Sequence, residues 1–118
     1  MSTKWVVHKF GGTSVADAER YRTAAKILLS RQLGQRTAVV VSAMGGVTDE
    51  LIRSIDLAAN QDDSYLAKLQ SLKERHLQTL TGLGLTAARQ QSLSEAIGAD
   101  FHENEEELRG VWITRLAS

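Results

Sequence analysis

The amino-acid sequence predicts an α/β fold, in which a βαβ unit of a parallel sheet is followed by a mostly helical segment. Two short apolar runs, Trp5 to Phe10 and Thr37 to Ser42, are too continuously apolar for half-exposed strands and are typical of a buried parallel sheet. A helical pattern lies between them, and after residue 50 only helical spacing of apolar residues is found. Proline is absent from the 118 residues, as expected for long helices with few interruptions.

The composition is that of an ordinary globular domain. Hydrophobic residues make up 42% and charged residues 24% of the chain, and 14 basic side chains balance 14 acidic ones. This balance gives no indication of a nucleic acid or an anionic membrane as a partner. The sequence has no apolar run of the roughly 18 residues that a membrane-spanning helix needs, and no secretory signal is visible. Because cysteine is absent, disulfides and thiolate metal sites are excluded, and we expect a cytoplasmic protein.

The helix between the two strands is expected to begin directly after the first glycine pair. Ser14 is its candidate N-cap, because a serine hydroxyl can accept a hydrogen bond from a backbone N–H of the first turn. Helical spacing predicts an inner face that consists of Ala18, Tyr21, Ala25 and Leu28. We expect the helix to run to about Gln32, with Gly34 as its C′ residue. The order strand, helix, strand then makes the two strands parallel.

Each predicted strand is followed by a glycine pair, Gly11-Gly12 after the first and Gly45-Gly46 after the second. A strand that passes through such a turn into a helix leaves backbone N–H groups pointing one way, and these groups attract anions. Lys9 adds a mobile positive charge beside the first turn. Since parallel strands end at the same edge of the sheet, the two turns are expected to be neighbours, where open α/β sheets bind ligands. The sequence therefore predicts a phosphate site, although its spacing matches neither the P-loop nor the dinucleotide fingerprint.

Two hydroxyl residues near the second glycine pair are candidates for contact with a substrate. Thr48 precedes a helix expected from Asp49 to about Asn60, so its side chain fits both an N-cap and a substrate contact. Ser42 fits a plain strand end better than a substrate contact. No metal site is predicted, because the three histidines do not cluster in the sequence and the glutamates at 105–107 fit a solvated helix face.

Two further helices are expected in the second half of the chain. Asp62 and Asp63 are placed to cap one of them, and Thr86 to start the other. The predicted inner faces of the three helices are, in chain order, Leu51, Ile55 and Ala58; Leu66, Leu69, Leu72, His76 and Leu80; and Leu93, Ile97, Phe101, Leu108 and Trp112. Gly98 is a candidate break in the last helix, since glycine costs about 1 kcal/mol there relative to alanine.

Two segments together resemble the start of the aspartate kinases, a branch of the amino-acid kinase family. They are Lys9-Phe10-Gly11-Gly12-Thr13-Ser14-Val15 and Val41-Ser42-Ala43-Met44-Gly45-Gly46-Val47-Thr48-Asp49-Glu50-Leu51. The resemblance extends over the whole chain. It implies a three-layer α/β/α kinase domain of which residues 1–118 are the incomplete N-terminal part, with no second domain present.

The resemblance also implies an activity and a set of site residues. The family branch phosphorylates the side-chain carboxylate of L-aspartate with ATP to 4-phospho-L-aspartate, the first step toward lysine, threonine and methionine. Matched by position, Lys9 binds the transferring phosphoryl group, and Thr48 holds the aspartate, with Ser42 as a weaker substrate candidate. The residues that line the ATP phosphates are Lys9, Phe10, Gly11 and Gly12.

Other parts of the family's active site are expected outside this chain. They are a glutamate of a Gly-Glu motif, an arginine and aspartate pair, and a nucleotide lobe, so these 118 residues alone are expected to be inactive. The resemblance also implies Mg²⁺, whose ligands are not identifiable in this chain. It further implies a homo-oligomer. One alternative is a glutamate or acetylglutamate kinase, which the Ser-Ala-Met-Gly-Gly-Val-Thr loop and the long helical segment disfavour. The other is a non-catalytic βα module that binds a phosphorylated small molecule.

Overall fold

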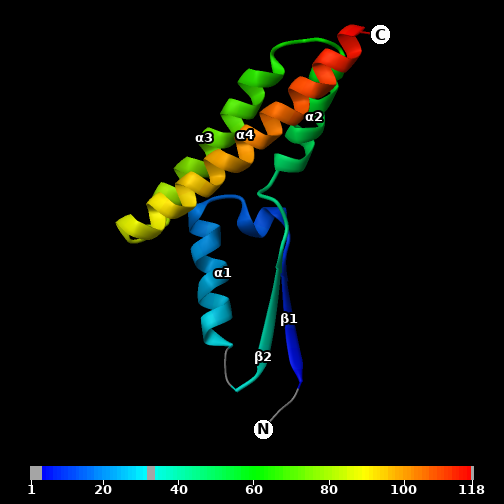
Figure 1. Cartoon of the computed structure of the whole chain (residues 1–118). Coiled ribbons are helices and arrows are strands. Elements are labelled where there is room, and N and C mark those ends of the chain that lie inside the picture. Colours follow the sequence, from blue (N-terminus) through cyan, green and yellow to red (C-terminus); the bar gives the residue numbers. More distant parts are fainter. Residues whose placement is uncertain (1–3, 32–33, 118) are drawn as a thin grey trace. The chain divides into compact units, whose positions relative to one another are not determined.

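The computed structural model of the chain describes residues 4–31 and 34–117. In chain order its elements are β1 (Trp5–Phe10), the short 3₁₀ helix η1 (Gly12–Val15), α1 (Ala18–Ser30), β2 (Arg36–Val41), α2 (Val47–Ala59), α3 (Tyr65–Gly82) and α4 (Ala87–Ala117), as Figure 1 shows. The chain divides between Gly46 and Val47 into two compact units. The predicted α/β class with a helix-rich second half is confirmed.

The first unit contains the predicted parallel strand pair. β1 and β2 run parallel, with Trp5 opposite Arg36 and Phe10 opposite Val41. The first strand has the predicted bounds, whereas the second begins one residue earlier and ends at Val41, so that Ser42 follows it. The Ser42 N–H still donates to the carbonyl of Phe10 at 3.0 Å, which continues the strand pairing by one hydrogen bond.

The prediction that both strands are buried is wrong for most of this sheet, since even Val39 and Val41 of β2, the partners of His8 and Phe10, are 43% and 48% exposed. Side chains alternate along β1, so Phe10 points into the core while Trp5 and Val7 point the opposite way. Trp5 is 60% and Val7 63% exposed, and Val40 on β2 is 50% exposed. Within the described residues the sheet has two strands, and α1 packs on the Phe10 side, so the other face keeps its apolar side chains in contact with solvent.

The start of α1 differs from the prediction. Ser14 is not its N-cap, because residues Gly12–Val15 first form the 3₁₀ turn. Asp17 caps the helix instead, and its Oδ1 accepts the N–H of Arg20 at 2.9 Å. A 3₁₀ turn between the glycine pair and the helix moves the cap three residues along the chain, to the next side chain that can accept such a bond.

The inner face and the end of α1 also need correction. Ala24, not Ala25, is buried, and it forms a small core with Phe10 and Val15 against which Tyr21 and Leu28 pack. The helix ends at Ser30 with Arg31 as its C-cap, so Gly34 lies too far along to be the C′ residue, although its φ of 68° is left-handed. The predicted end at Gln32 lies outside the described residues.

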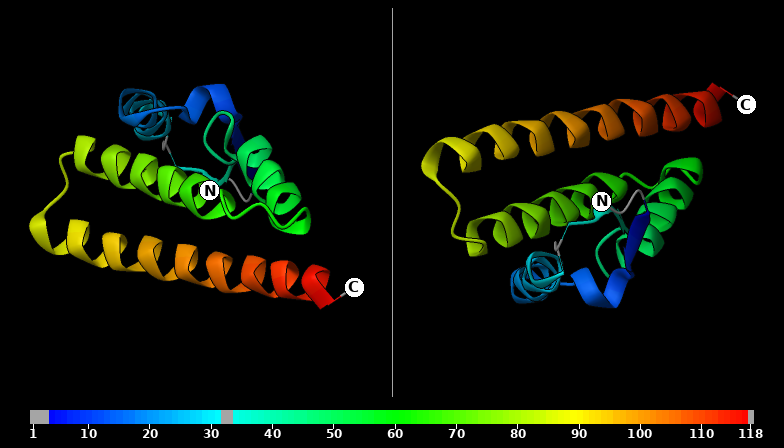
Figure 2. Two further views of the ribbon diagram at one scale, coloured as in Figure 1. Left: turned by 90° about the horizontal axis from the view of Figure 1, so that it is seen from above. Right: turned by 90° about the horizontal axis from the view of Figure 1, so that it is seen from below.

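The second unit is a bundle of the predicted helices α2, α3 and α4, each of which contacts the other two. Figure 2 shows α4 running antiparallel to α3, to which a short turn joins it. A buried cluster unites the three helices and consists of Ala58, Tyr65, Leu69 and Leu108, with Leu51, Leu57, Val111 and Trp112 packed against it. The hydroxyl of Thr86 accepts the N–H of Arg89 at 3.3 Å, and α4 continues through Gly98 without a break.

Some predicted core positions in this bundle are exposed. Ile55, Leu66 and Leu93 keep 48%, 45% and 45% of their surface in solvent. On α2 the predicted positions Ala58 and Leu51 do lie at the core, whereas Ser54, and not its neighbour Ile55, is the buried residue between them. His76 is a satisfied core residue, since its Nδ1 lies 2.7 Å from the Leu72 carbonyl and its ring lies edge-on to Phe101. None of the helices in the described part of the chain combines the length and hydropathy of a membrane span.

Candidate functional site

The two glycine turns of the first unit lie directly against each other, as the sequence predicts. A Cβ atom on Gly12 would stand 3.3 Å from the Cα of Gly45 and 3.4 Å from the carbonyl oxygen of Ala43. A Cβ atom on Gly45 would stand 3.2 Å from the carbonyl oxygen of Gly12. These distances are at or below the lower limit of ordinary van der Waals contact, and the opposing atoms belong to the backbone. Only glycine therefore fits at either position without displacing the other turn.

The turn after β1 is closed by a hydrogen bond from the Ser14 N–H to the Gly11 carbonyl at 3.0 Å. This bond makes the 3₁₀ turn over Gly12–Val15 and occupies the Ser14 amide. An anion at this turn therefore has to use the other N–H groups of the turn. In the second turn Gly46 has a φ of 83°, a conformation that L side chains rarely adopt, and it leads the chain into α2.

Lys9 and Phe10 are neighbours in sequence but point to opposite faces of β1. The Phe10 side chain is buried in the small core under α1, while the Lys9 side chain is exposed at the carboxyl end of the strand. Phe10 therefore anchors the strand end through its side chain, and only its backbone is left for a ligand. Lys9 is the residue whose cationic group can move toward an anion at the adjacent turn.

The two hydroxyl candidates have different local roles. The Ser42 hydroxyl is exposed and donates to the carbonyl of Ala43 at 2.8 Å. Thr48 is the second residue of α2, which begins at Val47, so the expectation that it caps a helix starting at Asp49 is wrong. The structure thus brings together Lys9, both glycine turns and Ser42 in the first unit, whereas Thr48 belongs to the second unit.

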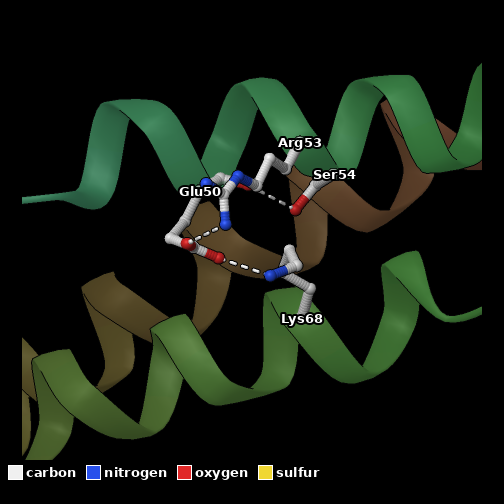
Figure 3. Close-up of polar contacts among 4 residues, drawn as sticks. All are labelled: Glu50, Arg53, Ser54 and Lys68. Carbon is white, nitrogen blue, oxygen red and sulfur yellow. Dashed lines mark hydrogen bonds and ion pairs between the residues drawn. The ribbon is translucent and has the colours of Figure 1, made fainter.

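An ion-pair network that the sequence did not predict holds the first turn of α2 against α3, as Figure 3 shows. One carboxylate oxygen of Glu50 accepts from Lys68 on α3 at 2.5 Å, and the other lies 3.3 Å from a guanidinium nitrogen of Arg53. The Glu50 carbonyl accepts the hydroxyl of Ser54, a side chain with no exposed surface. The hydrogen bond from Lys68 is the main cause that lowers the pKa of Glu50 below its ordinary value; partial desolvation opposes it and the charges of Lys68 and Arg53 assist it. The Glu50–Arg53 spacing is visible in the sequence, but Lys68 lies 18 residues away.

Potential metal ligands do not cluster in the part of the chain that the structure describes. The described residues contain no group of three or more histidine, aspartate or glutamate side chains that could hold a metal ion. Two of the acidic residues have other local roles, Asp17 as the cap of α1 and Glu50 in the ion pair with Lys68.

The chain as a whole is similar to known proteins. The model of the amino acid kinase family matches residues 4–111, which is most of the chain. The chain belongs to the amino acid kinase family.

Relatives within this family carry aspartokinase names. The chain is 38% identical over 114 residues to a bifunctional aspartokinase/homoserine dehydrogenase of Zea mays, and 37% identical over 114 residues to one of Arabidopsis thaliana. Each of these alignments covers 97% of this chain and 12% of the relative. A shorter match, 60% identical over 48 residues, covers 40% of this chain and 12% of an aspartokinase of Thermus thermophilus. The chain thus spans about an eighth of the length of the relatives it matches.

Proposed function

We propose that the chain is part of an aspartate kinase, which transfers the γ-phosphoryl group of ATP to the side-chain carboxylate of L-aspartate. The observation that carries this proposal is the contact between the Gly12 and Gly45 turns, which joins the strand end bearing Lys9 to the Ser-Ala-Met-Gly-Gly-Val-Thr loop. The aspartokinase names of the relatives support aspartate over glutamate or acetylglutamate as the acceptor. The product is 4-phospho-L-aspartate.

Each site residue has a physical role in this reaction. A carboxylate oxygen of aspartate forms a bond to the γ-phosphorus while the bond from that phosphorus to the ADP oxygen breaks. Lys9 neutralises negative charge on the transferring group, and the Phe10–Gly12 backbone lies along the phosphates. Thr48 holds the aspartate through its hydroxyl, and Ser42 is a second hydroxyl for the same substrate. Such a reaction needs positioning and charge neutralisation more than a protein nucleophile.

Mg²⁺ accompanies ATP in phosphoryl transfer, where it neutralises phosphate charge. The described residues do not form a set of three acidic or imidazole ligands, so we assign none of them to the metal.

The proposal is tested with the full-length protein that carries this chain. Purified enzyme is given ATP and Mg²⁺ with L-aspartate, L-glutamate or N-acetyl-L-glutamate, and acyl phosphate is trapped as the hydroxamate. We expect product with aspartate and little with the other two acceptors. Product with glutamate or acetylglutamate instead would assign the chain to another branch of the family. Absence of product with all three would favour a non-catalytic module, which binding of phosphorylated small molecules would then test.

A further inference from the structure

The first turn of α2 contains both Thr48, the residue proposed to hold aspartate, and Glu50, which is tied to another helix. The backbone groups at the start of a helix have no partners within the helix, so this turn frays unless other contacts hold it. Thr48 lies two residues before Glu50, within the same turn. Contacts that hold Glu50 therefore also hold the backbone of the turn from which the Thr48 side chain projects.

Glu50 is held at both its side chain and its backbone. Its carboxylate bridges Arg53 on its own helix and Lys68 on α3, and its carbonyl accepts the hydroxyl of the buried Ser54. Figure 3 shows Lys68 reaching from α3 toward the Glu50 carboxylate, while Arg53 approaches it from α2. The link from Lys68 is the part of this network that connects Glu50 to a different helix.

Both side chains of the Glu50–Lys68 pair are partly shielded from solvent. The side chains of Lys68 and Glu50 are 29% and 32% exposed, so both are partly removed from water, whereas Arg53 is 68% exposed. A hydrogen bond between two charged groups is shorter and stronger than one between neutral groups. Loss of Lys68 would leave Glu50 with a single, mostly solvated cation.

We propose that the Glu50–Lys68 ion pair positions Thr48 for the amino-acid substrate, which makes Lys68 a positioning residue of the aspartate site. This inference rests on the proposed function. It predicts that loss of the Lys68 charge on α3 lowers the affinity for aspartate and leaves the affinity for ATP unchanged. The competing explanation is that the pair stabilises the bundle of α2, α3 and α4 and has no bearing on the substrate.

The test uses Lys68→Met in the full-length kinase, with KM measured separately for aspartate and ATP. We expect the KM for aspartate to rise about three- to fivefold, which corresponds to the upper range measured for partly exposed ion pairs. The KM for ATP and kcat should stay within about twofold, because the first glycine turn is not altered. Lys68→Arg, which keeps a cation that can reach Glu50, should recover most of the affinity for aspartate. Lys73→Met makes the same change further along α3 and should leave both KM values unchanged.

A second measurement reports on the turn itself. In Lys68→Met the backbone N–H groups of Leu51 and Ile52 should exchange with deuterium faster than in wild type, while those in the middle of α3 keep their rates. Should Lys68→Met not fold, Glu50→Gln removes the charge of the pair with a smaller change in shape and is measured in the same way.

The outcomes separate this inference from the proposed function. An active wild type whose Lys68→Met variant has an unchanged KM for aspartate would overturn the inference alone. An equal rise in both KM values, together with a lowered melting temperature, would also overturn it and show that the pair is only structural. A wild-type enzyme that forms no aspartyl phosphate would contradict the proposed function. The substrate role of the Glu50–Lys68 pair would then be overturned as well, and the exchange rates would report only on the first turn of α2.

Discussion

Gly12 and Gly45 meet backbone to backbone, although 32 residues of chain separate them. Each glycine lies in the turn that follows a different strand of the parallel pair, so their contact joins the two turns at the carboxyl edge of the sheet. A side chain at either position would press on backbone atoms of the other turn, which cannot rotate away as a flexible side chain can. The contact thus requires two glycines at once, and each position can be tested separately.

We expect Gly12→Ala and Gly45→Ala each to lower the free energy of unfolding by about 1–3 kcal/mol, the range for forcing extra atoms into a packed site. Both should also reduce kcat/KM of the full-length kinase, because the two turns are pushed apart. Gly98→Ala is the matched control, since a Cβ there meets no atom within 4 Å and lies in the interior of α4. This control should raise stability by about 1 kcal/mol and leave activity unchanged. Thermal unfolding and steady-state kinetics of the three variants check the prediction, and a stable, fully active Gly12→Ala would contradict it.

Lys9→Met should lower kcat of the full-length kinase far more than it raises the KM for aspartate. The reason is that the Lys9 ammonium acts on charge that develops as the phosphoryl group moves. Lys9→Arg should also be impaired, because a planar guanidinium does not occupy the position of a compact ammonium. Lys26→Met, on the exposed surface of α1, serves as the control for loss of one positive charge. If either Lys9 variant keeps kcat within about threefold of wild type, the assignment is wrong.

Thr48→Val should raise the KM for aspartate much more than the KM for ATP, because the hydroxyl that is lost faces the amino acid in the proposed site. Since Thr48 is the second residue of α2 and not its N-cap, we expect the melting temperature to change little. A surface change of this kind usually alters stability by no more than about 0.5 kcal/mol. Thr48→Ser, which keeps the hydroxyl, should bind aspartate nearly as wild type does. An unchanged KM for aspartate with a clear loss of stability would show that the residue acts on the helix alone.

The ion pair of Glu50 predicts a dependence of stability on pH. Because its pKa is lowered in the folded chain, Glu50 contributes stability above its ordinary pKa of 4.5 and loses that contribution as the pH falls through the folded value. Melting temperatures of wild type and Lys68→Met should therefore differ most near neutral pH and converge in acid. Lys73→Met on α3 serves as the control for loss of one positive charge. A difference between wild type and Lys68→Met that stays constant down to pH 3 would contradict this account.

The sequence predicted the strands, their parallel pairing and the meeting of the two glycine turns, and it missed one local turn and one contact between helices. The bounds of β1 were predicted because an apolar run is followed at once by Gly11, and the parallel pairing follows from the order of elements. Asp17 was missed as a cap because nothing in the sequence marks the 3₁₀ turn that precedes it. The Glu50–Lys68 pair is a tertiary contact between two helices, which helical spacing alone does not show.

The exposed face of the sheet predicts that the isolated 118-residue chain associates with itself. Trp5, Val7 and Val40 are exposed apolar side chains on one face of the sheet, here called the exposed strip, and each strand of the two-stranded sheet has one edge that is not paired within the described residues. Such strips and edges are templates for pairing with another chain. Light scattering after size exclusion should show dimers or larger species whose proportion rises with concentration.

Val7→Lys places a charge in the middle of that strip and should shift the isolated chain toward monomer, because burying a lysine against a second sheet is costly. Ile113→Lys adds the same charge on α4, where the side chain is 48% exposed, and should leave the association unchanged. If both variants become monomeric, charge repulsion and not the sheet controls the association. A wild-type chain that stays a monodisperse monomer at high concentration, with one sharp melting transition, would show that the exposed strip does not drive pairing.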